Sequence, residues 1–400
     1  MLRIKLVILL LGALVVAPVY GENASVRQLA NGLPQRSEPL LIKALNEISA
    51  QHLDTALQDI GVLVRQNPKF RLAQLIYGDL LLAQAKALQG FGSPADMATP
   101  QVAALRHEAL ARWQHHLQRP PANTAPQMLV RLPPSQRHAV VIDLNKARLY
   151  LFANRQGIPR LLHDYYISSG KNGARKVREG DQRTPVGVYF VTGRLSPQKL
   201  PDRYGVGAFP INYPNAWDRR LGNTGSGIWV HGVPSDTYSR PPQASDGCVA
   251  LSNTDLLALE PFLDIGQTPV IIAEGVAWID PQQWQQQQER FTELLENWRQ
   301  DWQSLDTARY LRHYSKAFNA QGKNYQAWAQ HKQRVNARKA SLKVALSEVS
   351  VFRYPGESGM VVTTFQQDYR SNNFRDQVKK RQYWRQETDG VWRIVYEGPA

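Results

Sequence analysis

The 400-residue chain has a single cysteine, Cys248, and therefore no internal disulfide. A lone thiol is either an inert core residue or one kept for its reactivity. The chain also lacks a glycine-rich loop of the kind that cradles phosphates. Beyond the first 21 residues it has no apolar run long enough to span a bilayer. These absences argue against a disulfide scaffold, a phosphate-loop enzyme and a protein with several membrane spans.

The beginning of the chain has the layout of a secretory signal. Arg3 and Lys5 precede a nearly unbroken apolar run from Leu6 to Val19, and a site with small residues follows. This order predicts a signal peptide over residues 1–21. The run is shorter than the ~20 residues that span a bilayer, and an uncleaved anchor is the alternative. The absence of a nearby cysteine excludes a lipidated N-terminus.

Acidic side chains are scarce relative to basic ones. The chain has 33 Asp and Glu against 48 Lys and Arg, which gives a formal net charge of +15 at pH 7. Such a charge favours an anionic partner. For an exported protein, a cell wall that carries carboxylates or an anionic membrane surface fits better than nucleic acid. The basic residues are dispersed, so a solvated surface explains part of the charge equally well.

Hydrophobic periodicity divides the chain into three regions. Helical spacing over residues 37–88 and 101–117 predicts an all-α region at 22–118, a helical hairpin with a weak likeness to tetratricopeptide repeats. Prolines mark a linker at 119–135. Short alternating strands predict a mainly-β domain at 136–275, with one helix that Asn253 is expected to cap. Three helices followed by strands predict an α+β domain at 276–400.

The surroundings of Cys248 favour a nucleophile. A catalytic thiol needs a base, donors for an oxyanion and a rigid, accessible position. His231 lies 17 positions upstream at the end of a predicted strand and is the natural base. The amides of Gly247 and Cys248 are candidate oxyanion donors, and Ser245 and Asp246 lie on the same turn. Taken alone, this pattern is also compatible with an inert, buried cysteine.

The order His231-Gly232, then a loop, then Ser245-Xaa-Gly247-Cys248 resembles the signature of the YkuD-type L,D-transpeptidase catalytic domain. The resemblance covers about residues 136–274. It includes three further segments, Val141–Leu144 with Arg148–Leu151, Ser168–Lys171 and Thr184–Tyr189.

The resemblance implies a chemistry and a role for each residue of the motif. Cys248 would attack a peptide bond in a peptidoglycan stem tetrapeptide, and His231 would move the proton. The carbonyl of Gly232 would orient the imidazole, Gly247 would supply an oxyanion amide, and Ser245 would support the site from behind. An amine acceptor would make the enzyme a transpeptidase, whereas water would make it a hydrolase. The partners implied are peptidoglycan stem peptides, in the bacterial cell envelope and most naturally the periplasm.

Two positions depart from the common family pattern. Asp246 stands where histidine is usual, and Ala250 stands where arginine is usual. The missing arginine puts recognition of the donor stem in doubt. Alanine there resembles a subgroup that contains a periplasmic hydrolase, which releases wall-linked lipoprotein, so a lipoprotein or another envelope protein is a further expected partner.

Other side chains near the motif are expected to recognise the stem peptide. Arginine binds carboxylates in a bidentate manner, so Arg240 and Arg219 are candidates, with Tyr238 and Asp246 beside them. A solvated loop arginine is the alternative for Arg240.

The C-terminal region resembles the SnoaL-like cone, in which helices curl over a bent antiparallel sheet. Its aromatic residues either line a pocket or form the core, and the core is favoured. They are Trp298, Tyr310, Tyr314, Trp328, Phe365, Tyr369, Trp384 and Trp392. We expect no metal and no other cofactor, because His163 and the pair His115-His116 lack convergent partners. A non-catalytic envelope-binding protein is a third hypothesis, beside the transpeptidase and the hydrolase.

Overall fold

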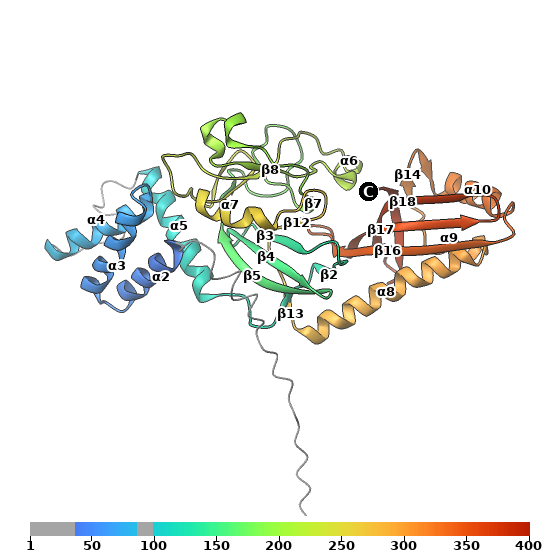
Figure 1. Cartoon of the computed structure of the whole chain (residues 1–400), viewed down its shortest axis with the longest axis horizontal. Helices are drawn as coiled ribbons and strands as arrows, with labels where there is room; N and C mark the ends of the chain where they lie inside the picture. Colours follow the sequence, from blue (N-terminus) through green and yellow to red (C-terminus); the bar gives the residue numbers. More distant parts are fainter. Residues whose placement is uncertain (1–36, 86–98) are drawn as a thin grey trace, which may run out of the picture. The chain divides into compact units, whose positions relative to one another are not determined.

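The computed structural model describes residues 37–85 and 99–400, and the predicted signal peptide lies outside them. The helical region consists of α2 (Ser37–Ser49), α3 (Leu53–Gln66), α4 (Arg71–Ala85) and α5 (Pro100–Leu117) (Figure 1). These helices form because apolar side chains recur on one face, and Leu41, Ile60 and Ile76 from that face are buried in a common core. Thr99 begins α5 by accepting a hydrogen bond from Val102 N, with Pro100 at the first helical position.

The central domain is built on a mixed sheet of five strands. Its order is β5-β4-β3-β12-β7, in which β12 runs parallel to β3 and the other pairs are antiparallel. The strands are β3 (His138–Asp143), β4 (Arg148–Arg155), β5 (Ile158–Tyr166), β7 (Gly187–Phe190) and β12 (Pro269–Ala273). The burial of both faces of β3, β4 and β12 explains why their sequences are almost continuously apolar.

Two smaller sheets of the same domain carry the catalytic motif. One has the order β11-β9-β8, and the other pairs β10 with β6. Their strands are β6 (Ser169–Gly170), β8 (Ala208–Pro210), β9 (Trp229–His231), β10 (Gln243–Ser245) and β11 (Val249–Ala250). The helix that follows is α7 (Asn253–Leu259). Its N-cap is Ser252, whose Oγ accepts from Asp255 N at 3.0 Å, so the expectation that Asn253 caps it is wrong.

The predicted linker takes part in two sheets. Its strand β1 (Ala125–Pro126) pairs with β13 (Trp278–Ile279), and β2 (Leu129–Arg131) pairs with β16 of the C-terminal domain. The prolines of this segment limit its strands to two or three residues, because proline donates no ladder hydrogen bond. The segment is therefore a structural connection and not a free spacer.

The C-terminal domain is the predicted α+β cone. Its sheet has the order β19-β18-β17-β16-β2 and is antiparallel throughout. The strands are β16 (Leu342–Arg353), β17 (Met360–Ser371), β18 (Arg375–Gln386) and β19 (Trp392–Pro399), and the helices are α8 (Pro281–Gln303), α9 (Thr307–Leu311) and α10 (Tyr325–Asn336). All eight aromatic residues singled out above are buried in one cluster, which confirms that they form the core.

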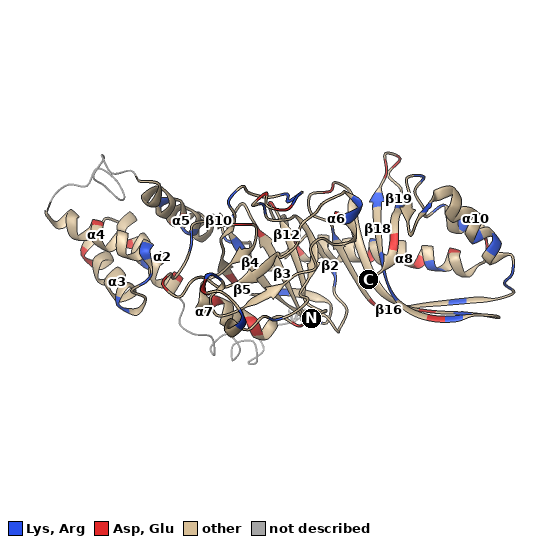
Figure 2. Cartoon of the chain, turned by 90° about the horizontal axis from the view of Figure 1, so that it is seen from above, with Lys and Arg blue, Asp and Glu red and all other residues tan. Residues whose placement is uncertain are grey.

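Figure 2 shows basic and acidic residues interspersed over the helical, β and C-terminal parts rather than gathered in one place. This distribution favours the solvated-surface interpretation for much of the positive charge. Within residues 37–85 and 99–400, no helix has both the length and the apolar character needed to cross a membrane.

Candidate active site

Two neighbouring parallel strands bring the cysteine and the histidine together. Val249 pairs with Val230 and Ala250 with His231, so Cys248 lies just before β11 and beside β9. The Trp229 amide donates to Cys248 Sγ at 3.4 Å, and Sγ lies 3.4 Å from the carbonyl oxygen of Gly227. The thiol is thus held against the backbone that leads into His231.

The thiol is only partly exposed, and this sets its acidity. Burial raises the pKa of Cys248, and the negative charge of Asp246 acts in the same direction. The Trp229 amide and the charges of Lys176 and Arg240 oppose this rise in the pKa without overcoming it. Cys248 is therefore a protonated thiol near neutral pH, and its activation requires a base.

His231 has the state that such a base needs. Its Nδ1 lies 2.6 Å from the carbonyl oxygen of Gly232. A carbonyl only accepts, so Nδ1 carries the proton and Nε2 is left free to take one. Burial lowers the pKa of His231 to about 4, and the positive charges of Arg240 and Arg203 contribute. The imidazole is therefore neutral at pH 7.

The thiol and the imidazole lie at neighbouring strands but share no hydrogen bond among the described residues. No hydrogen bond joins Cys248 Sγ to the His231 ring in the described part of the chain. The edge of the His231 ring meets Tyr204, with the two centroids 5.1 Å apart. Catalytic hydrogen bonds are often long before substrate binds, so this geometry is compatible with a base that engages during reaction.

The turn before Cys248 requires glycine. Gly247 has φ 121°, and a Cβ there would lie 2.7 Å from the carbonyl oxygen of Arg183. Ser245 Oγ accepts from Gly247 N at 3.2 Å and donates to the carbonyl oxygen of Cys248 at 2.6 Å, so this side chain ties the turn together. The Gly247 amide already has a partner, contrary to the expectation that it is an oxyanion donor. Of the two amides considered, that of Cys248 is the better candidate.

Asp246 is paired with a cation, as its position beside a reactive thiol requires. Its Oδ1 accepts from Lys171 Nζ at 2.9 Å and from Gln182 Nε2 at 3.2 Å. The Lys171 hydrogen bond lowers the pKa of Asp246, so this carboxylate is ionised at neutral pH. Asp246 therefore joins the Lys171 and Gln182 segments to the turn of the nucleophile.

The three other predicted substrate-binding residues lie in different surroundings. Arg240 Nη2 donates to the carbonyl oxygen of Arg203 at 3.1 Å, and its charge acts on both Cys248 and His231. Arg219 instead donates to the carbonyl oxygen of Pro214 on the approach to α6 (Ala216–Arg220).

Tyr238 packs on Phe70 of the helical region, with ring centroids 4.4 Å apart. We correct the expectation for this side chain, because its ring is engaged in packing between two regions. Of these three residues, only Arg240 has a charge that acts on Cys248 and His231.

The roles of two residues near the site escaped the sequence analysis. Asn253 Oδ1 accepts from Val206 N at 3.2 Å and Val233 N at 3.1 Å, and its Nδ2 donates to Val233 O at 2.9 Å. It thereby fixes the backbone that follows His231. Lys176 is a buried cation whose Nζ lies 2.8 Å from Asp181 Oδ1, and its charge acts on Cys248. An asparagine before a helix suggests a cap, and a loop lysine suggests solvent, so neither role had a local signal.

In the described residues, no group of three or more His, Cys, Asp or Glu side chains is arranged to hold a metal ion.

Two family models match this chain. Residues 137–272 match the L,D-transpeptidase catalytic domain (YkuD), and residues 290–398 match the Cds6 C-terminal NTF2-like domain. A search of curated proteins found no match.

Solved structures resemble more of the chain. Bd1075 of Bdellovibrio bacteriovorus is 28% identical, with a TM-score of 0.61 over 69% of this chain and 98% of that one. The helical cell shape determining protein Pgp2 from Campylobacter jejuni is 26% identical, with a TM-score of 0.59 over 68% of this chain and 95% of that one.

These matches confirm the two domain resemblances and the multidomain fold class. A YkuD domain identifies a cysteine enzyme that modifies peptidoglycan. Residues 137–272 are thus an L,D-transpeptidase catalytic domain of the YkuD family, followed by an NTF2-like domain at residues 290–398.

Proposed function

We propose that the protein is an L,D-transpeptidase that remodels peptidoglycan through a thioester on Cys248. One observation carries the proposal. A buried, neutral His231, with Nδ1 fixed on the carbonyl of Gly232, lies on the strand next to a partly exposed and protonated Cys248. This is a nucleophile and base pair at rest, in which the proton still belongs to the thiol.

The reaction proceeds through two acyl transfers. His231 Nε2 takes the proton of Cys248 as Sγ attacks the carbonyl carbon of the third residue of a stem tetrapeptide. The Cys248 amide is the donor best placed to receive the oxyanion. The C–N bond then breaks, His231 returns the proton to the leaving amine, and D-alanine departs. An amine of a second stem attacks the thioester, which forms the new amide bond and frees the thiol.

We place this activity in the bacterial cell envelope, most naturally the periplasm. The charged, apolar and small-residue order of residues 1–21 supports export. The likeness to Pgp2, described as a helical cell shape determining protein, supports a role in cell shape.

A hydrolase is the second candidate, and Ala250 favours it. This residue is 2% exposed and pairs with His231, so the place where the family usually has arginine holds only a buried methyl group. Without that cation, recognition of the donor stem is in doubt, and alanine at this place resembles the subgroup that contains the periplasmic hydrolase. The released partner would then be a wall-linked lipoprotein or a cross-linked stem.

Mass spectrometry of products separates the two candidates. The purified protein is incubated with tetrapeptide stems and lipoprotein-linked stems, with Cys248→Ala as the control. We expect new cross-linked dimers and free D-alanine that depend on Cys248. Loss of linked species with no new bond would instead establish the hydrolase, and no Cys248-dependent change would refute both.

A further inference from the structure

The loop between β9 and β10, residues 232–242, is held by the helical region. Ser239 Oγ donates to Glu108 Oε1 at 2.6 Å, across 131 positions of sequence. Glu108 belongs to α5 and is only 1% exposed. A buried carboxylate is costly unless its oxygens are well hydrogen bonded, so this contact has a defined geometry.

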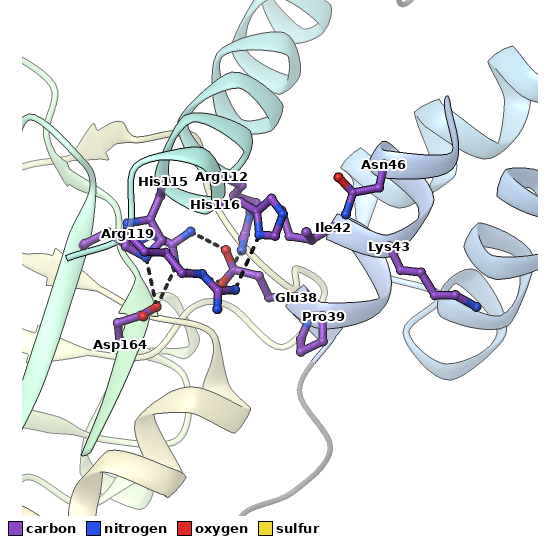
Figure 3. A pocket seen from close by; sticks show the side chains of 11 residues that line it. Glu38, Pro39, Ile42, Lys43, Asn46, Arg112, His115, His116, Arg119 and Asp164 are labelled. Atoms are coloured by element: carbon purple, nitrogen blue, oxygen red, sulfur yellow. Dashed lines mark hydrogen bonds and ion pairs between the residues drawn. The ribbon is translucent and has the colours of Figure 1, made fainter. Parts of the chain in front are cut away.

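Arg112, one turn along α5, donates to the same oxygen of Glu108. Its Nε and Nη2 donate to Glu108 Oε1 at 3.0 and 2.8 Å. Figure 3 shows Arg112 and Glu38 of α2 pointing toward one another, with Arg112 Nη1 lying 3.3 Å from Glu38 Oε2. Arg112 is 3% exposed and is thus held between two carboxylates. Such a rigid guanidinium can place its neighbours with direction as well as attraction.

The same guanidinium reaches the loop a second time through an aromatic ring. Arg112 Cζ lies 3.7 Å from the centroid of Tyr166, the last residue of β5. The hydroxyl of Tyr166 donates to the carbonyl oxygen of Arg240 at 2.9 Å. Two adjacent residues of the loop, Ser239 and Arg240, are therefore anchored by one buried cluster.

The segment between α3 and α4 holds the earlier part of the loop. Lys69 Nζ donates to the carbonyl oxygen of Ser235 at 2.7 Å, and Tyr238 N donates to the carbonyl oxygen of Lys69 at 3.3 Å. The stacking of Tyr238 on Phe70 completes this contact. The helical region therefore touches the loop along much of its length.

A chain of contacts runs from the anchored loop to the catalytic histidine. Arg240 Nη2 donates to the carbonyl oxygen of Arg203, whose guanidinium lies 4.9 Å from the Tyr204 ring centroid. Tyr204 in turn meets the edge of His231. A continuous set of contacts thus connects α5 with the imidazole, and both Arg240 and Arg203 place positive charge around it.

We propose that α5 is a positioning element of the active site: Glu108 holds the Ser239 hydroxyl, and Tyr166 of β5, packed on Arg112, holds the Arg240 carbonyl, so that the Arg240 guanidinium faces the substrate side of Cys248. This inference rests on the proposed function, because the group that Arg240 would meet is a carboxylate of the stem peptide. Glu108 and Tyr166 act through Arg240 and are not themselves catalytic.

Two conservative variants of the full-length protein test the positioning role. Ser239→Ala removes the hydrogen bond to Glu108, and Tyr166→Phe removes the hydrogen bond to Arg240. Tyr150→Phe is the matched control, because its buried hydroxyl has no hydrogen-bond partner among the described residues. Hydrogen–deuterium exchange of residues 233–242 should accelerate in both variants and stay unchanged in the control. Equal exchange in all four proteins would overturn the proposal.

Kinetics with a stem tetrapeptide donor then link the loop to catalysis. We expect KM to rise about threefold to tenfold in Ser239→Ala and Tyr166→Phe, the range set by one lost hydrogen bond, with kcat nearly constant. In an Arg240→Ala background the further effect of Tyr166→Phe should vanish, because the side chain that it positions is gone. Faster exchange with unchanged KM, or full additivity with Arg240→Ala, would show that α5 only packs against the loop.

Failure of the proposed function would have a different appearance. If the unsubstituted protein does not act on stem peptides, no variant will give a measurable rate with the tetrapeptide donor. Hydrogen–deuterium exchange still decides whether α5 holds the loop. The rate at which iodoacetamide alkylates Cys248 then measures whether the loop affects the reactivity of the thiol. Loss of the Arg240 charge from the site should slow alkylation in both variants but not in Tyr150→Phe, and an unchanged rate would overturn the link to the active site.

Discussion

The helical region and the NTF2-like domain both pack on the catalytic domain, but through opposite chemistry. Charged side chains make the junction with the helices. Glu38 of α2 is paired with Arg148 of β4 and with Arg112 of α5, and Arg148 Nη1 also lies 3.3 Å from Asp164 Oδ1. Arg148 is only 1% exposed, and these side chains line a cavity of about 400 Å³.

Apolar side chains make the junction with the NTF2-like domain. One buried cluster combines residues of the catalytic sheet with residues of the C-terminal sheet. Trp217 of α6 stacks on Tyr383 of β18 at 5.3 Å between centroids, and its Nε1 donates to Glu357 Oε1 at 3.1 Å. The short strand β2 adds a ladder of backbone hydrogen bonds to β16.

The chemistry of each junction determines whether it only attaches a domain or also fixes a geometry. Apolar burial is non-directional and scales with area, so it attaches a domain without specifying one fine geometry. Buried charges and hydrogen bonds tolerate little displacement, so they specify geometry at some expense of stability. The charged junction is the one that continues into Ser239 and Arg240, and the proposed positioning of Arg240 depends on precise placement of these two residues.

The largest effect should follow from opening the apolar junction. Trp217→Ala removes a side chain that is 2% exposed and should lower the free energy of unfolding by about 4 kcal/mol, as for other buried aromatic residues. Denaturant unfolding measures this. Leu221→Ala, at a 54% exposed position close by, is the control and should change stability by less than about 0.5 kcal/mol. Similar small losses for both would mean that the two domains are not joined by a shared core.

Breaking the charged junction should have a somewhat smaller effect that can be reversed. Arg148→Met leaves Glu38 without its main cation and removes one of the cations beside Asp164, and it should lower the free energy of unfolding by about 3 kcal/mol. Adding Glu38→Leu to Arg148→Met should restore a large part of this loss, because the uncompensated charge is removed. If the double variant is no more stable than Arg148→Met, the charges do not form one coupled group.

The pH dependence of catalysis should be set by the ionisation of His231 and Cys248, and the charges of the two domain junctions should not affect it. Burial lowers the pKa of His231 to about 4 and raises that of Cys248. Below its pKa the imidazole is protonated and takes no proton, so kcat/KM should fall about tenfold for each pH unit below 4. It should be flat through neutral pH and change again only where the thiol ionises. An acidic limb near pH 6.5 would contradict the burial of His231.

The sequence signals of the candidate active site are local. His231-Gly232 and Ser245 to Cys248 are short segments whose spacing and residue types identify the family, and the structure shows that β9, which ends at His231, and β11, which follows Cys248, are neighbouring strands. The periodicities of the three regions likewise predict the order of helices and strands. The need for glycine at 247 is a structural finding, because the turn before Cys248 has a positive φ there.

What the sequence does not predict depends on partners that are distant along the chain. Glu108 and Ser239 are 131 positions apart, and no periodicity connects them. Asn253 has the residue type of a cap but bonds to two amides of other segments. Tyr238 has the type of a binding residue but packs on Phe70. Tertiary packing decides these roles, because each side chain has several local alternatives of similar free energy.

The central claim is that Cys248 becomes acylated by the donor stem with His231 as its base. Intact-protein mass spectrometry after brief exposure to a tetrapeptide donor, without acceptor, tests it most directly. We expect one adduct of the mass of the donor less D-alanine, mapped by peptide analysis to Cys248, absent in Cys248→Ala and strongly reduced in His231→Ala. Turnover of the donor without any adduct on Cys248, or with equal acylation of His231→Ala, would contradict it.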